Sequence, residues 1–125
     1  MTSDDYRRII HRVVRGLADR GPCVIVGHAA QMACGDRADV LRVFVHAPLM
    51  TRTRRVAEER GISLDQAAEM VKHDDKQRND LFSMYYGVRW NDPDLYVVTL
   101  NTGIVTMETA TDVLLRLVDQ FKSAR

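Results

Sequence analysis

Apolar residues along the chain follow helical and strand-like patterns in turn. Near the start they recur every three or four residues, as on one face of a helix that ends at Gly21-Pro22. That face consists of Tyr6, Ile9, Ile10, Val13, Val14 and Leu17. Either Asp4 or Asp5 can cap this helix. Three continuously apolar runs, typical of strands buried on both faces, cover residues 23–27, 42–47 and 95–100.

Start and stop signals frame two helices between the second and third of these runs. Pro48 suits the first turn of a helix that ends at Gly61. Ser63 and Gln66 form a capping box, which opens a long helix over residues 64–86. The sequence therefore predicts a pair of consecutive helices.

A short helix over residues 29–34 and a last helix capped by Thr106 complete the order. Strands that alternate with helices indicate a parallel sheet. We expect an α/β fold, a three-layer-like domain with a short parallel sheet of about three strands and flanking helices. Residues 1–125 form one domain, since no linker or repeat interrupts them.

Composition excludes several classes of protein. Eighteen Lys and Arg against seventeen Asp and Glu give a net charge of +1, which argues against nucleic-acid binding through bulk charge. The start of the chain has neither the basic nor the apolar region of a signal peptide, and no apolar run approaches the ~18 residues of a membrane span. Cys23 and Cys34 form neither a disulfide framework nor a zinc site. We expect a cytoplasmic protein with no membrane or nucleic-acid partner and no metal.

Charged residues interrupt the apolar face of the long helix. Asp75 and Arg78 fall where the face that includes Val71 and Phe82 would continue. A charge turned toward a core is costly unless it is paired. Either Asp75 and Arg78 satisfy each other, or the middle of the helix is solvated, or this face lines a cleft. In such a cleft Arg78 would bind an anion, and Asp75 would orient Arg78 or a ligand hydroxyl.

Two further features are open to both a functional and a structural interpretation. Arg52 and Arg55 share one helix face, either as phosphate ligands or as a solvated surface. His28 follows a glycine at the carboxyl end of a predicted strand, where α/β folds bind ligands, although a structural role is equally common there. Residues 101–103 are typical of a turn, and Trp90 with its neighbouring tyrosines is expected to pack.

Taken together, six ordered segments resemble the cytidylate kinase-like proteins of the P-loop nucleoside monophosphate kinase superfamily. The similar segments are Val24–Ala29, Val43–Pro48, Arg52–Arg55, Asp75–Arg78, Asp92–Tyr96 and Leu100–Thr102. The resemblance extends over roughly residues 20–121. It implies a P-loop kinase fold in which residues 49–86 form lid-type helices.

The resemblance also implies a nucleotide or phosphate site. Arg52 and Arg55 resemble lid arginines that reach the transferring phosphates. Asp75 and Arg78 resemble a pair that contacts nucleotide sugar and phosphate. His28 stands where the family usually has an arginine that contacts the acceptor phosphate.

The chain departs from the family in ways that bear on catalysis. Ala29 and Val71 replace an aspartate and an arginine of related kinases. The loop Gly-x-x-x-x-Gly-Lys-Ser/Thr, which cradles the donor phosphates, does not occur in the sequence. We assign no catalytic residue and expect a non-catalytic remnant that binds a nucleotide or phosphate. The alternatives are a self-associating structural or regulatory module without a ligand, and a kinase half completed by another chain.

In this superfamily the strand that leads into the phosphate loop lies between those that match residues 23–27 and 42–47. Without it, these two strands must close up or leave unpaired apolar edges, which favour association. We expect either a compact three-stranded, truncated kinase fold or a sheet completed by another chain. The most economical partner is a second copy, so a homo-oligomer, most simply a homodimer, is predicted.

Overall fold

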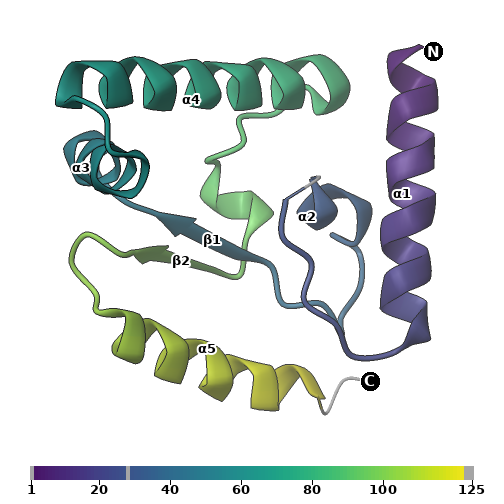
Figure 1. Ribbon diagram of the computed structural model, residues 1–125. Coiled ribbons are helices and arrows are strands. Elements are labelled where there is room, and N and C mark those ends of the chain that lie inside the picture. Colours follow the sequence, from purple (N-terminus) through teal and green to yellow (C-terminus); the bar gives the residue numbers. More distant parts are fainter. Residues whose placement is uncertain (1, 28, 123–125) are drawn as a thin grey trace.

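The computed structural model describes residues 2–27 and 29–122. These residues form α1 (Ser3–Arg20), α2 (Ala30–Ala33), β1 (Val43–His46), α3 (Leu49–Arg60), α4 (Leu64–Tyr86), the 3-10 helix η1 (Pro93–Leu95), β2 (Val98–Asn101) and α5 (Met107–Lys122). Figure 1 shows the strands between α3 and α4 on one side and α5 on the other, with α1 upright beside α2. The predicted α/β class and its layered arrangement are confirmed.

The strands β1 and β2 form a parallel sheet, with α3 and α4 as the connection between them. Val43 pairs with Val98 at one end of the sheet and His46 with Asn101 at the other. In the described residues the sheet has these two strands rather than about three.

The second strand begins later than the predicted 95–100. Asp92 caps the short 3-10 helix before it, and its carboxylate accepts a hydrogen bond from the Asp94 amide at 2.9 Å. The local turn formed by Asp92 and Pro93 therefore delays the extended backbone to Val98.

The predicted strand over residues 23–27 is not formed. No backbone hydrogen bond joins this segment to β1 or β2 in the described part of the chain. Ile25 packs against the cluster that contains Val14, whereas Val24 and Val26 are 91% and 84% exposed. The expectation of burial on both faces was therefore wrong, because only one face of this segment has a neighbour. The sheet has not closed into a three-stranded form.

Helix α1 is capped by Thr2 rather than by Asp4 or Asp5. The Thr2 hydroxyl accepts a hydrogen bond from the Asp5 amide at 3.1 Å, and the Asp5 carboxylate accepts one from the Thr2 amide at 3.2 Å. This reciprocal capping box satisfies two amides that would otherwise lack partners.

The apolar face of α1 is covered only in part. Val14 and Ala18 are buried against the side chains around α2. Ile9 and Val13, which belong to the predicted stripe, are more than half exposed. One of the two rows of apolar side chains on α1 thus faces solvent.

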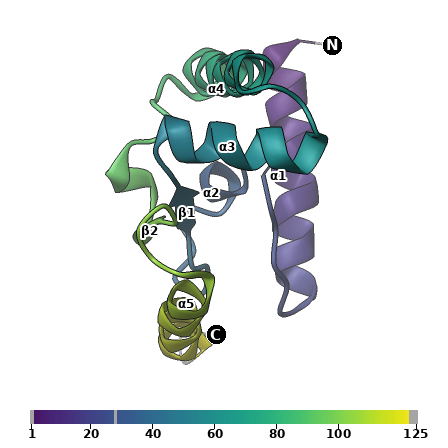
Figure 2. The same ribbon diagram turned by 60° about the vertical axis from the view of Figure 1, so that its left-hand side comes forward.

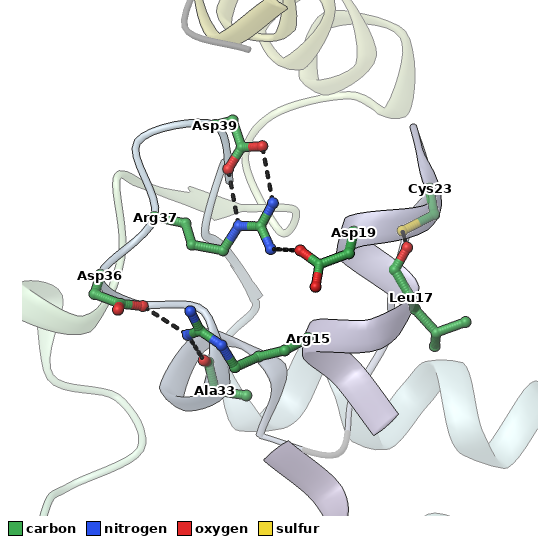
Figure 3. A network of polar contacts seen from close by, with 8 residues as sticks. All are labelled: Arg15, Leu17, Asp19, Cys23, Ala33, Asp36, Arg37 and Asp39. Carbon is green, nitrogen blue, oxygen red and sulfur yellow. Dashed lines mark hydrogen bonds and ion pairs between the residues drawn. The ribbon is translucent and has the colours of Figure 1, made fainter. Parts of the chain in front are cut away.

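Charged side chains attach the carboxyl half of α1 to the loop after α2 (Figure 3). Arg15 donates hydrogen bonds to a carbonyl of α2 and to Asp36, each at 2.9 Å. Arg37 donates to Asp19 at 2.6 Å and to both oxygens of Asp39 at 3.0 and 3.1 Å. The Arg37 and Asp39 side chains are mostly buried, so their two-pronged ion pair is better shielded than an ordinary surface pair.

Helices α3 and α4 form a helical hairpin whose axes cross steeply, since Figure 1 shows α3 end-on beside α4, which runs across the view. In Figure 2, α3 lies between α4 and the strands. Gly61 ends α3 with a left-handed backbone at φ 64°, and the Ser63–Gln66 capping box opens α4 as predicted. Ala57 and Ala67 are both buried and allow the two helices to approach closely. This hairpin corresponds to the predicted helices of residues 49–86.

Helix α5 is held loosely. Among its described residues only Ala110 is buried, and Met107 and Leu115 are mostly exposed. The Thr106 hydroxyl accepts a hydrogen bond from the Thr109 amide at 3.1 Å, which confirms the predicted cap. No helix in the described part of the chain is long and apolar enough to cross a membrane.

Candidate functional site

Helices α3 and α4 bring four of the five predicted site residues to one open cleft of about 290 Å³. Its lining consists of Arg52, Arg55, Val56, Val71, Asp74, Asp75 and Arg78. The fifth predicted residue, His28, lies outside the described residues. The charged groups lie on two packed helices, in which Ala57 and Ala67 are buried.

Asp75 orients Arg52. One terminal nitrogen of the Arg52 guanidinium, Nη1, donates to both carboxylate oxygens of Asp75, at 2.9 and 3.0 Å. Its Nε donates to the Ala47 carbonyl at 2.8 Å, next to the end of β1. The Arg52 and Asp75 side chains are 33% and 26% exposed, so the pair borders the cleft rather than lying in bulk solvent. Asp75 lines the cleft, as one of the three alternatives expected, but the arginine that it orients is Arg52 rather than Arg78.

Arg55 reaches the turn after β2. Its two terminal nitrogens donate to the Thr102 hydroxyl at 2.9 Å and to the Thr102 carbonyl at 2.7 Å. The Thr102 amide donates in turn to the His46 carbonyl at 2.8 Å, which anchors this turn to β1. Thr102, in the turn after β2, is thus a partner of Arg55 that the sequence did not predict.

The turn itself has the local chemistry expected of residues 101–103. The Asn101 side chain accepts a hydrogen bond from the Gly103 amide at 2.9 Å. A Cβ atom at Gly103 would lie 2.8 Å from a side-chain carbon of Pro48, so a larger residue there would force the backbone to move. The turn interpretation is confirmed, and glycine is required by the close approach of Pro48.

Arg78 is the arginine of the cleft that keeps its hydrogen-bond donors available. Its guanidinium lies over the ring of Trp90, with 4.9 Å between the guanidinium carbon and the ring centre. Within the described part of the chain, no carboxylate or carbonyl accepts a hydrogen bond from it. The alternative in which Arg78 pairs with Asp75 is therefore not formed.

From the sequence, Trp90 was predicted only to pack against neighbouring side chains. Trp90 does pack, edge-on against Phe44 with ring centres 4.9 Å apart. Phe44 also stacks on Tyr96 at 5.0 Å, and the Tyr96 hydroxyl donates to the Trp90 carbonyl. No local sequence signal predicts the contact between Trp90 and Arg78, because eleven residues and the end of a helix separate them.

The charges of the cleft suit a single anionic group. Asp75 offsets Arg52, whereas Thr102 binds Arg55 without neutralising it. Asp74 adds one more carboxylate to the lining. Three arginines against two aspartates leave an excess of one positive charge in the lining of the cleft. Guanidinium groups bind phosphate well because their planar N–H donors match two phosphate oxygens at once.

A family model matches most of the chain. The model of the cytidylate kinase-like family matches residues 1–104. Among curated relatives, a cytidylate kinase of Aeropyrum pernix is 36% identical over 100 residues, which are 79% of this chain and 57% of that protein. A cytidylate kinase of Desulfurococcus amylolyticus is 33% identical over 103 residues, 82% of this chain and 55% of that protein.

A solved structure shares the fold. The crystal structure of an uncharacterized protein from Eubacterium ventriosum superimposes with a TM-score of 0.81 at 28% sequence identity. The match covers 88% of this chain and 63% of that one. The chain thus spans a little over half the length of the two curated relatives, and somewhat more of the structural neighbour.

Proposed function

Because the chain belongs to the cytidylate kinase-like family, we propose that it binds the phosphate of a nucleotide, or of another phosphorylated compound, without transferring a phosphoryl group on its own. The observation that carries the proposal is Arg78, whose guanidinium lies at the cleft between α3 and α4 with no protein acceptor among the described residues. The rest of the proposed phosphate site consists of Arg52, Arg55 and Asp75.

The sequence supports the non-catalytic part of the proposal. Phosphoryl transfer depends on positioning and charge stabilisation of the donor phosphates. The 125 residues contain no Gly-Lys-Ser or Gly-Lys-Thr, so the backbone cradle and lysine of such a loop are not encoded in them. Arg52 is moreover engaged by Asp75, which lowers its share in holding an incoming phosphate.

Thermal unfolding in the presence of ligands tests the binding. We expect CMP, dCMP or inorganic phosphate at millimolar concentration to raise the unfolding temperature, and ATP serves as a comparison. A ligand at 100 times its dissociation constant adds about 2.7 kcal/mol of stability, which such a measurement detects readily. No stabilisation by any of the four compounds would contradict the proposal.

A pair of variants then assigns the site. Arg78→Ala should abolish the ligand-dependent shift, because it removes the available guanidinium. Arg54→Ala is the matched control, since Arg54 is an exposed arginine on α3 that does not line the cleft. The unfolding temperature of both variants without ligand shows whether either change acts through stability alone.

Catalysis is tested separately. Measured transfer of a phosphoryl group from ATP to CMP by the purified chain would overturn the non-catalytic part of the proposal. A kinase half would differ both from a chain that is active alone and from a non-catalytic one. Its activity would arise only on addition of a polypeptide that carries a phosphate-binding loop.

One observation favours a second candidate, a structural or regulatory module that associates with a second copy of itself. Val24 and Val26 are almost fully exposed, and in the described residues β1 is paired on one side only. Each copy thus has an unpaired strand edge and an unpaired apolar segment, which two copies related by a twofold axis could match reciprocally. Light scattering coupled to size-exclusion chromatography tests this, and a monomer at all concentrations would exclude it.

A further inference from the structure

Arg78 has no polar partner in the described residues, yet its position is defined by an aromatic side chain. The guanidinium carbon lies 4.9 Å from the centre of the Trp90 ring, within the range of a cation–π contact. Arg78 belongs to α4, and Trp90 to the turn that follows this helix. The turn folds back so that the indole supports a cation on the same face of α4 as Asp75.

We propose that Trp90 is a positioning residue for the anion site: it holds the Arg78 guanidinium over its ring so that the N–H donors of Arg78 remain free for a phosphate. The inference rests on the function proposed above. Since the chain contains a single tryptophan, the same indole is an internal reporter of the state of Arg78.

The chemistry of the two groups explains why an aromatic support suits this task. The N–H bonds of a guanidinium lie in its plane, so a ring below that plane attracts the charge and takes none of the donors. A carboxylate partner would fix Arg78 equally well, but it would occupy those donors and cancel the charge. Asp75 does this to Arg52, which makes the two arginines of the cleft chemically different.

Trp90 is itself held from two sides. Its ring meets Phe44 of β1 edge-on, with an angle of 72° between the ring planes. Its carbonyl accepts the hydrogen bond of the Tyr96 hydroxyl. The support under Arg78 is therefore held against β1 through Phe44 rather than by the turn alone.

Packing alone does not account for an indole at this position. The Trp90 Nε1 atom is buried without a hydrogen-bond partner in the described residues, which is unfavourable for a polar group. An aliphatic side chain would fill the space against Phe44 without an unpaired donor. What it would lack is a π face for Arg78.

The test begins with the emission of Trp90 in the wild type and in Arg78→Ala, with Arg54→Ala as the control. If the stack forms, Arg78→Ala changes the intensity or the wavelength of emission and Arg54→Ala does not. Identical emission in the wild type and Arg78→Ala overturns the inference, whether or not any phosphate binds.

Affinity for inorganic phosphate, measured by calorimetry, gives the second readout. Trp90→Leu should weaken binding about two- to fivefold, the range expected for loss of one exposed cation–π contact, and Trp90→Phe should weaken it less. Wild-type affinity in both variants overturns the inference while leaving the proposed function intact. If the wild type itself does not bind phosphate, the proposed function fails, and the emission comparison still decides whether Trp90 supports Arg78. If Trp90→Leu does not fold, Trp90→Phe and the emission comparison provide the test.

Discussion

His11 links α1 to the end of α4 through its ring. Its Nε2 atom lies 3.1 Å from the Tyr86 hydroxyl, and the two rings stack with their centres 5.8 Å apart. Burial lowers the pKa of His11 below its usual range, and the nearby cations Arg7 and Arg15 lower it further. The neutral imidazole is therefore the form that the contact between the helices favours.

This pKa shift predicts a dependence of stability on pH. The unfolded chain binds a proton at His11 near the ordinary value of about 6.5, whereas the folded chain binds it only at lower pH. The contribution of His11 to stability is therefore complete above that value and is lost as the pH falls through it toward the folded pKa. We expect urea unfolding between about pH 8 and about pH 5 to show a smaller loss of stability for His11→Gln than for the wild type.

His73→Gln is the control, because His73 is exposed on α4. Parallel pH profiles for the wild type and His11→Gln would show that protonation of His11 does not oppose folding. The difference between the two profiles matters rather than either one alone, since paired carboxylates such as Asp36 also titrate on the acid side.

At the scale of elements, the cap of α4 is the contact whose removal has the most predictable cost. The Ser63 hydroxyl accepts a hydrogen bond from the Gln66 amide at 3.1 Å, and the Gln66 side chain accepts one from the Ser63 amide at 3.2 Å. Ser63→Ala should lower the free energy of unfolding by about 1 kcal/mol. Ser83→Ala, an exposed change near the other end of α4, should leave it unchanged or slightly raise it. Equal stability of the two variants would mean that the cap contributes nothing.

Elements with local end signals were predictable from the sequence. The bounds of α3 and α4 agree with the prediction because Pro48, Gly61, Ser63 and Gly87 act through their own backbone and nearest neighbours. The error at residues 23–27 has the opposite origin. Three consecutive β-branched side chains predict a strand, but a strand also needs a partner edge, and that depends on distant parts of the molecule.

The same distinction applies to the candidate site. Helical spacing was enough to place Asp75 and Arg78 on one face, and Arg52 and Arg55 on another. It could not say that Asp75 would bind Arg52, because that pair depends on how the hairpin closes. The contact of Arg78 with Trp90 depends in addition on the path of the turn after α4.

At the scale of the whole molecule, the exposed valines predict how the chain behaves at high concentration. If unpaired apolar segments associate, the wild type should show a mass in solution that rises with concentration. The double variant Val24→Lys with Val26→Lys should remain a monomer, because like charges would meet at the contact. Ile104→Lys, which places a charge on an equally exposed turn, is the control and should behave as the wild type. Association of all three proteins to the same extent would exclude segment 23–26 as the contact.

The uneven burial of the helices has a consequence for dynamics. Helix α5 buries Ala110 alone among its described residues, whereas α3 and α4 are joined through several buried side chains. Backbone amides of residues 107–122 should therefore exchange their hydrogens with deuterated solvent through local opening, long before those of the hairpin. The arginine cleft would then keep its shape in molecules whose last helix has already melted, so the loss of helical signal on heating need not report the loss of the anion site.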